Sequence, residues 1–91
     1  MIELGGNIRL EGFEDAEKGS LVIIKKIVGN YVRNMQQNHK FKSLELMMKN
    51  KVNFSAKLEL ENKKIESKIE NKNVFFGLNG VLKDVSEQLG E

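Results

Sequence analysis

The sequence contains no cysteine, a single histidine and no long apolar run. Without cysteine, neither a disulfide framework nor thiolate chemistry is possible. The longest aliphatic run, Leu21–Ile24, stops at Lys25-Lys26 and is far shorter than the roughly 20 residues that span a bilayer. The N-terminus also lacks the charged-then-apolar layout of a signal peptide, so we expect a cytoplasmic protein without a membrane partner.

Few residues could carry catalysis. His39 is the only histidine, and no cysteine or spaced carboxylate pair accompanies it, which argues against a metal site. The serines lack the context of a nucleophile elbow, and Gly5-Gly6 is not followed by the lysine and hydroxyl residue of a phosphate-binding loop. We therefore expect no enzyme activity, no catalytic residue, no metal and no cofactor.

The composition describes an ordinary folded chain. Of its 91 residues, 40% are hydrophobic and 31% are charged, proportions that do not suit a disordered protein. The length suits a single domain, residues 1–91, with one two-layer core.

Four segments alternate apolar and polar residues with the period of a strand that buries one face. The first runs from Ile2 to Leu10, and Gly5-Gly6 marks a bulge or bend within it. The inner residues of the other three are Leu44, Leu46 and Met48; Val52, Phe54, Ala56, Leu58 and Leu60; and Ile65, Ser67 and Ile69.

Two further segments have the period of an amphipathic helix. The first extends from about Glu14 to Asn38, with a first turn that can be irregular, and the acids at its start suit a helix N-terminus. Its apolar stripe comprises Ile24, Ile27, Val28, Tyr31 and Met35. The second begins after Asn73, a good N-cap residue, and stops near Gly90. Its stripe comprises Val74, Leu78, Val81, Leu82, Val85 and Leu89.

This order of elements is β-α-β-β-β-α. Two strands joined by a helix should be parallel with a right-handed crossover, and the last three strands should form an antiparallel meander. We therefore predict an α+β fold, a two-layer sandwich in which a four-stranded mixed sheet carries both helices on one face.

The other face of the sheet should be open to water. Its charges alternate in sign and it has no aromatic residue, whereas single-strand RNA binders stack bases on exposed aromatic side chains. We expect a solvated face with cross-strand ion pairs. It comprises Glu3, Asn7, Arg9, Glu45, Met47, Lys57, Glu59, Lys64, Glu66, Lys68 and Glu70.

Positive charge is concentrated in the middle of the chain. Residues 20–51 contain seven Lys or Arg and one acid, a net charge of +6, while residues 1–19 carry −3 and residues 52–91 carry −1. The whole-chain charge of +2 conceals this segregation. A basic block of this kind is typical of a protein that meets a polyanion.

Part of the basic block forms a stripe on the first helix. From Lys26 to Lys40, cationic and amide residues recur at steps of four, three, four and three, which places them on one outward face. Such side chains can contact phosphates and 2′-hydroxyls without reading sequence. The alternative is a solvated lysine-rich face. The predicted nucleic-acid-binding residues are Lys25, Lys26, Asn30, Arg33, Gln37, Lys40, Lys42, Lys49 and Lys51.

Phe75 and Phe76 lie together at the start of the second helix, and only one of them can face inward. The other is a candidate dimer contact. Edge strands of the sheet offer a second way for two copies to pair. A protein-interaction or assembly module, either a homodimer or a subunit of a complex, is therefore the alternative to RNA binding.

The segment from Ala56 to Leu89 resembles the corresponding part of the ribosome hibernation-promoting factor family. The features that match are Leu58 and Leu60, the turn Asn62-Lys63, Ile65, Glu70-Asn71, and the helix from Phe75 through Gly80 to Leu89. The order of elements fits over the whole chain. The resemblance implies a βαβββα domain related in shape to double-stranded-RNA-binding domains.

The resemblance also implies a function. Such proteins bind the small ribosomal subunit near the decoding region and keep tRNA and mRNA out, with basic residues on both helices touching ribosomal RNA. The matching residues here are Lys25, Lys26, Arg33 and Lys40. The last helix departs from the pattern, because Lys83 is offset by Asp84, Glu87 and Glu91. We expect a non-enzymatic regulator that binds ribosomal or other structured RNA through its first helix and acts by steric occlusion.

Overall fold

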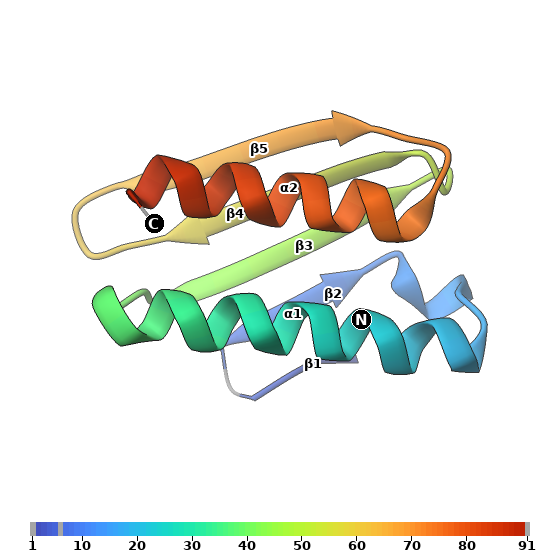
Figure 1. The fold of residues 1–91 in the computed structure, drawn as a ribbon, viewed down its shortest axis with the longest axis horizontal. Coiled ribbons are helices and arrows are strands. Elements are labelled where there is room, and N and C mark those ends of the chain that lie inside the picture. Colours follow the sequence, from blue (N-terminus) through green and yellow to red (C-terminus); the bar gives the residue numbers. More distant parts are fainter. Residues whose placement is uncertain (1, 6, 91) are drawn as a thin grey trace.

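The computed structural model describes residues 2–5 and 7–90. Within them, five strands form one mixed sheet in the order β1-β2-β3-β4-β5, and two helices lie side by side on one face of it (Figure 1). The strands are β1 (Ile2–Glu3), β2 (Ile8–Glu11), β3 (Ser43–Lys49), β4 (Asn53–Glu59) and β5 (Lys64–Glu70). The helices are α1 (Lys18–Asn38) and α2 (Val74–Leu89).

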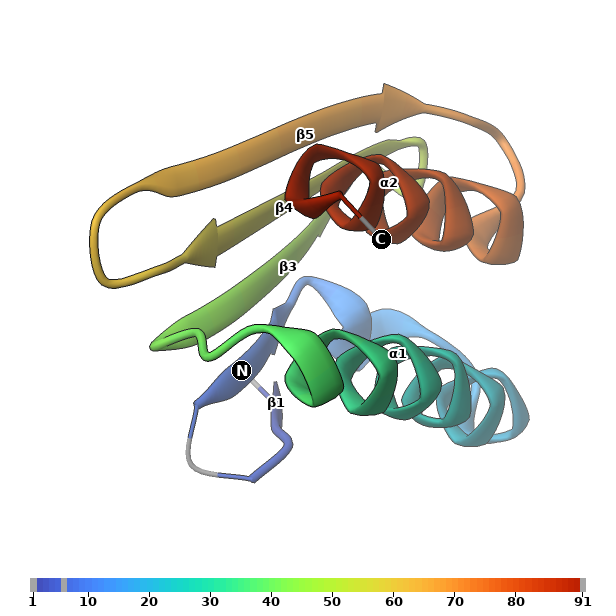
Figure 2. The same cartoon turned by 60° about the vertical axis from the view of Figure 1, so that its left-hand side comes forward.

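The predicted α+β class and strand pairing are confirmed. β2 and β3, which flank α1 in sequence, are parallel, while β3, β4 and β5 form an antiparallel meander. Figure 2 shows the helical layer and the sheet as two separate layers, with α1 beside β2 and α2 beside β4 and β5.

The predicted number of strands is wrong, because the first predicted strand is two strands. β1 runs antiparallel to β2, with Ile2 opposite Leu10. The chain reverses between them, where the Leu4 N–H donates to the Ile8 carbonyl oxygen at 2.8 Å and Gly5 adopts a φ of +68°. Only glycine takes this left-handed conformation readily. Gly5 therefore belongs to a hairpin connection and not to a bulge; Gly6 lies outside the described residues.

The first helix begins later than predicted. Phe13–Asp15 form a separate 3-10 turn, and α1 starts at Lys18. The acids expected in its first turn, which are Glu14, Asp15 and Glu17, therefore precede it. Ala16 and Glu17 are extended, each with a ψ of 151°, and separate the turn from α1. Gly12, which precedes the turn, has a φ of +84° and packs so closely on β3 that a Cβ there would collide with the Met48 carbonyl oxygen. This turn buries Phe13 completely, at a ring-centroid distance of 6.4 Å from Phe54.

The core lies between the sheet and the two helices. Most of the predicted inner faces of β3, β4 and β5 are buried, with Val52, Leu60 and Ile69 half-buried, and the predicted stripe of α2 from Leu78 to Leu89 is buried. On α1 the buried residues are Ile24, Val28, Val32 and Met35, while the predicted Ile27 and Tyr31 are half-buried at the margin. Burial thus follows the two periodicities read from the sequence, shifted on α1 toward Val32.

The termini of α2 are as predicted. The Asn73 Oδ1 accepts hydrogen bonds from the Phe75 and Phe76 N–H groups at 2.9 and 3.0 Å, which satisfies two donors of the first turn. Gly90 ends the helix with a φ of +91°. The start of α2 is therefore held in a fixed geometry.

Candidate nucleic-acid interface

α1 presents a polar row on the side away from the core. The row consists of Lys26, Asn30, Arg33 and Gln37, and all four side chains are exposed. At about 100° per residue they fall within an arc of about 60°, opposite the buried Val28 and Met35, and they cover about 16 Å of the helix. We call this row the α1 stripe.

No acid neutralises the α1 stripe from within its own element. The sequence contains no Asp or Glu between Glu17 and Glu45. Lys25 is exposed beside the stripe, and Lys40 is exposed just beyond the helix, which ends at the C-cap residue His39. The stripe therefore combines cations that suit phosphate oxygens with amides that can both donate to and accept from 2′-hydroxyls.

The structure does not gather all nine predicted residues into one surface. Lys42 is exposed, but its N–H donates to the Glu59 carbonyl oxygen at 2.7 Å. This bond places Lys42 beside the end of β4, where Glu59 and Glu61 contribute negative charge. Lys42 therefore lies near the C-terminal end of α1, but unlike the α1 stripe it has acids beside it.

Lys49 and Lys51 lie at the opposite end of β3, about 20 Å from its first residue. Lys51 has a φ of +59° in the β3–β4 turn, a left-handed conformation that is uncommon for lysine. The Asn71 N–H donates to the Val52 carbonyl oxygen at 2.8 Å, which brings the β5–α2 connection against this turn. Sequence reasoning missed this long-range contact, and with it Lys72 as a neighbour of the turn.

The outer sheet face has the alternating charges predicted for it. A row across all five strands places Glu3, Arg9, Glu45, Lys57 and Glu66 opposite one another in succession. The Lys57 Nζ lies 3.7 Å from the Glu66 Oε1. Opposite charges on neighbouring strands favour each other, so this row is largely self-neutralising.

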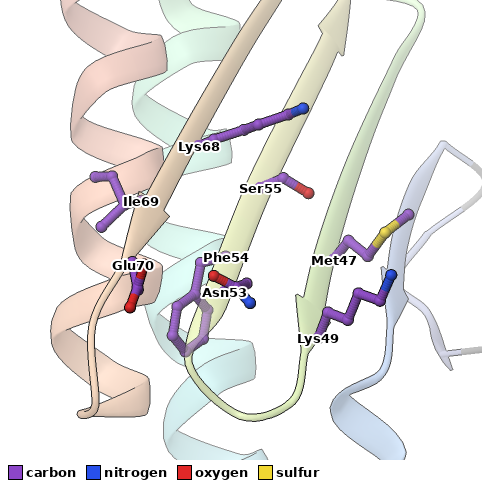
Figure 3. A pocket seen from close by; sticks show the side chains of 8 residues that line it. All are labelled: Met47, Lys49, Asn53, Phe54, Ser55, Lys68, Ile69 and Glu70. Carbon is purple, nitrogen blue, oxygen red and sulfur yellow. The ribbon is translucent and has the colours of Figure 1, made fainter.

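A shallow groove of about 490 Å³ opens on the same outer face. Figure 3 shows that Lys68 and Met47 flank the short Ser55 of β4, with Lys49 at one end. Glu70 also lines the groove, so its charges are of both signs. Lys49 therefore belongs to a mixed-charge surface on the far side of the sheet from the α1 stripe.

His39 has a backbone role at the end of α1. Its N–H donates to the Met35 carbonyl oxygen at 2.9 Å, and the residue is half-buried. In residues 2–5 and 7–90, no group of three His, Cys, Asp or Glu side chains could hold a metal ion. The helices of this part of the chain are too short or too polar to cross a membrane.

The helical layer also exposes apolar side chains that the sequence reading did not assign. Val22 and Ile23 of α1 are 57% and 47% exposed, and Phe76 of α2 is 68% exposed. Phe75 is half-buried against the core, so the expectation that only one of the two phenylalanines faces inward is confirmed. Helical spacing could have revealed Val22 and Ile23, because both fall outside the arc of the buried row.

A scan of protein-family models and a search of curated protein sequences find no match. Several solved structures share the fold, including the following two. One is a ribosomal subunit interface protein from Coxiella burnetii, with a TM-score of 0.65 and 12% identity over 92% of this chain and 93% of that chain. The other is the N-terminal domain of Protein Y from Thermus thermophilus, with a TM-score of 0.56 and 10% identity over 90% and 91%. The resemblance to the hibernation-promoting factor family is thereby confirmed at the level of the fold.

Proposed function

We propose that this protein is a non-enzymatic regulator that binds the RNA of the small ribosomal subunit, or another structured RNA, and acts by steric occlusion. The main support for this proposal is the α1 stripe, because it is an exposed cationic row without acids on a helix. The chain shares its fold with a ribosomal subunit interface protein, which supports the ribosome as the source of the RNA. Such a role belongs in the cytoplasm, as we expect from the sequence.

The mechanism follows from the geometry of α1. The buried row, which includes Val28 and Met35, anchors the helix on the sheet, so the opposite row meets the RNA without having to be ordered first. Lys26 and Arg33 contact phosphates, and the alternating amides Asn30 and Gln37 contact neighbouring sugar hydroxyls. These contacts fix the protein on the RNA backbone, and its volume then excludes other ligands from the same site.

The acids of α2 determine which helix makes the main contact. Asp84 and Glu87 lie in the C-terminal half of α2, next to its cation Lys83. Like charges repel an RNA backbone there, whereas α1 has no such acid. The main contact with RNA is therefore made by α1.

The test is co-sedimentation with small ribosomal subunits at several salt concentrations. We expect the double variant Lys26→Glu/Arg33→Glu to bind roughly 100-fold more weakly, because two phosphate contacts become repulsive. The matched control is Lys63→Glu/Lys68→Glu, which changes the net charge equally but lies in the β4–β5 connection and on the outer face of β5. An equal loss in both variants, or no binding of the unmodified protein at low salt, would refute the proposal.

An assembly module is the alternative function, and one observation favours it. β5 is an edge strand of seven residues, whereas the other edge, β1, has only two. A long free edge can pair with a second copy. Light scattering at high protein concentration tests self-pairing: a dimer mass supports a homodimer, and a monomer mass argues against self-assembly.

A further inference from the structure

Phe76 is not among the described residues that form the core or pack against it. It is the most exposed of the large hydrophobic residues described, whereas its neighbour Phe75 packs against the core. Its N–H is held by the Asn73 Oδ1 at 3.0 Å, so the backbone that carries the ring is fixed at the start of α2. An aromatic ring that projects from a rigid helix start, and that is not used by the core, is a candidate contact for a ligand.

The surroundings of Phe76 suit a polyanion. No Asp or Glu occurs from Asn71 to Lys83, so Lys72 precedes and Lys83 follows Phe76 within an acid-free stretch that ends at Asp84. Lys83 follows Phe76 by seven residues, about two turns on the same face, the spacing that also separates Lys26 from Arg33. The nearest acid before this stretch, Glu70, ends β5 and faces the outer side of the sheet.

The ring and the α1 stripe lie on the same layer. Figures 1 and 2 show that both helices begin at the same end of the molecule and run side by side in the same direction. Val22 and Ile23, the other exposed apolar residues of this layer, are in the first two turns of α1, directly before Lys26. Packed helices are about 8–10 Å apart, so the outward faces of α1 and α2 are close neighbours in this layer.

From this arrangement we infer that an unpaired nucleobase of the RNA held by the α1 stripe stacks on Phe76. The inference rests on the proposed function and names the class of RNA, which is a structured RNA with an unpaired nucleotide and not an uninterrupted duplex. Bases inside a duplex remain stacked on each other, whereas a splayed base can stack on an aromatic side chain. A second copy of the chain is a poorer occupant, because three exposed side chains provide far less than the roughly 800 Å² per partner of a stable interface.

The test compares two labelled RNA hairpins whose stems are closed by a non-nucleotide linker in place of loop bases, and which differ only in one bulged nucleotide within the stem. The unmodified protein should bind the bulged hairpin roughly 10-fold more tightly than the continuous one, by the contribution of one stacked base. Phe76→Ala should abolish this preference while leaving the affinity for the continuous hairpin unchanged. Phe76→Trp should retain the preference, and Phe76→Leu, which is apolar without a ring, should lose it.

The outcomes separate the two proposals. Equal binding of both hairpins by the unmodified protein, with the Lys26→Glu/Arg33→Glu variant still weakened, would overturn the stacking and leave the proposed function standing. Binding of neither hairpin nor of ribosomal subunits would overturn both. A dimer of the unmodified protein that Phe76→Ala converts to a monomer would assign the ring to a contact between copies. Thermal unfolding of each variant shows that the fold persists.

Discussion

The two helices pack on the same sheet, but their glycines have opposite surroundings. A Cβ at Gly77 of α2 would collide with the ring of Phe54, and one at Gly80 would lie 2.6 Å from the Ile69 Cδ1. At Gly19 and Gly29 of α1, by contrast, no described atom beyond the adjacent residues and the helix's own backbone would lie within 4 Å of a Cβ. The glycines of α2 allow close packing, and α2 does lie closer to the sheet than α1.

The starts of the two helices also differ. α2 begins at Asn73, whose side chain caps two N–H groups. α1 begins after Glu17, whose side chain makes no capping hydrogen bond in the structure described. Close packing and a side-chain cap therefore distinguish α2, whereas α1 retains open glycines, a start that the Glu17 side chain does not cap and an acid-free outer face. Features that reduce stability without serving the core are expected where a surface serves binding.

The largest effect should follow from filling the glycine of α2 that faces the sheet. Gly77→Ala places a methyl group into the Phe54 ring, and we expect a loss of about 3 kcal/mol in the free energy of unfolding, measured by urea denaturation. The variant Phe54→Leu provides the control. In the Phe54→Leu background the same substitution should cost at least about 1 kcal/mol less, and equal costs in both backgrounds would show that the ring is not the obstacle.

A smaller effect should follow from exchanging the capping states of the two helices. Asn73→Ala removes the acceptor at the start of α2, so we expect a loss of about 1 kcal/mol in the free energy of unfolding. Asn73→Ser should retain most of the stability. Glu17→Ser should stabilise α1 by a few tenths of a kcal/mol or more, because it supplies the cap that α1 lacks. An Asn73→Ala variant with an unchanged free energy of unfolding would contradict the contrast between the starts of the two helices.

The smallest effect concerns an open glycine of α1. Gly29→Ala should raise the free energy of unfolding by about 0.8 kcal/mol, because alanine restricts the unfolded chain and meets no neighbour in the helix. The change has the opposite sign to that of Gly77→Ala. Destabilisation by Gly29→Ala in the same urea titration would mean that α1 is packed as closely as α2.

Much of the fold could be predicted from the sequence, because its signals are local. The alternation from Leu44 to Ile69 gives three strands, and Asn73 and Gly90 give the limits of α2. The split of the first strand could not be predicted, since Ile2 and Leu10 pair across β1 and β2 and therefore keep one parity through the hairpin. A period of two looks the same in one long strand and in two paired ones.

The candidate site was predictable to a similar extent. Exposure of Lys26 and Arg33 follows from their helical spacing, and the structure agrees. The separation of Lys49 from them depends on which face and which end of β3 it occupies, and Lys72 approaches the β3–β4 turn only through the bond between Asn71 and Val52. Such proximity arises from long-range pairing, which no local pattern encodes.

The most direct test of the central claim is the salt dependence of RNA binding. For the four cations on and beside the α1 stripe, the logarithm of the association constant should fall with the logarithm of salt concentration with a slope of about −3. Lys26→Ala/Arg33→Ala should reduce this slope to about −1.5, because two fewer phosphates are neutralised. An unchanged slope in that variant would contradict an interface centred on α1.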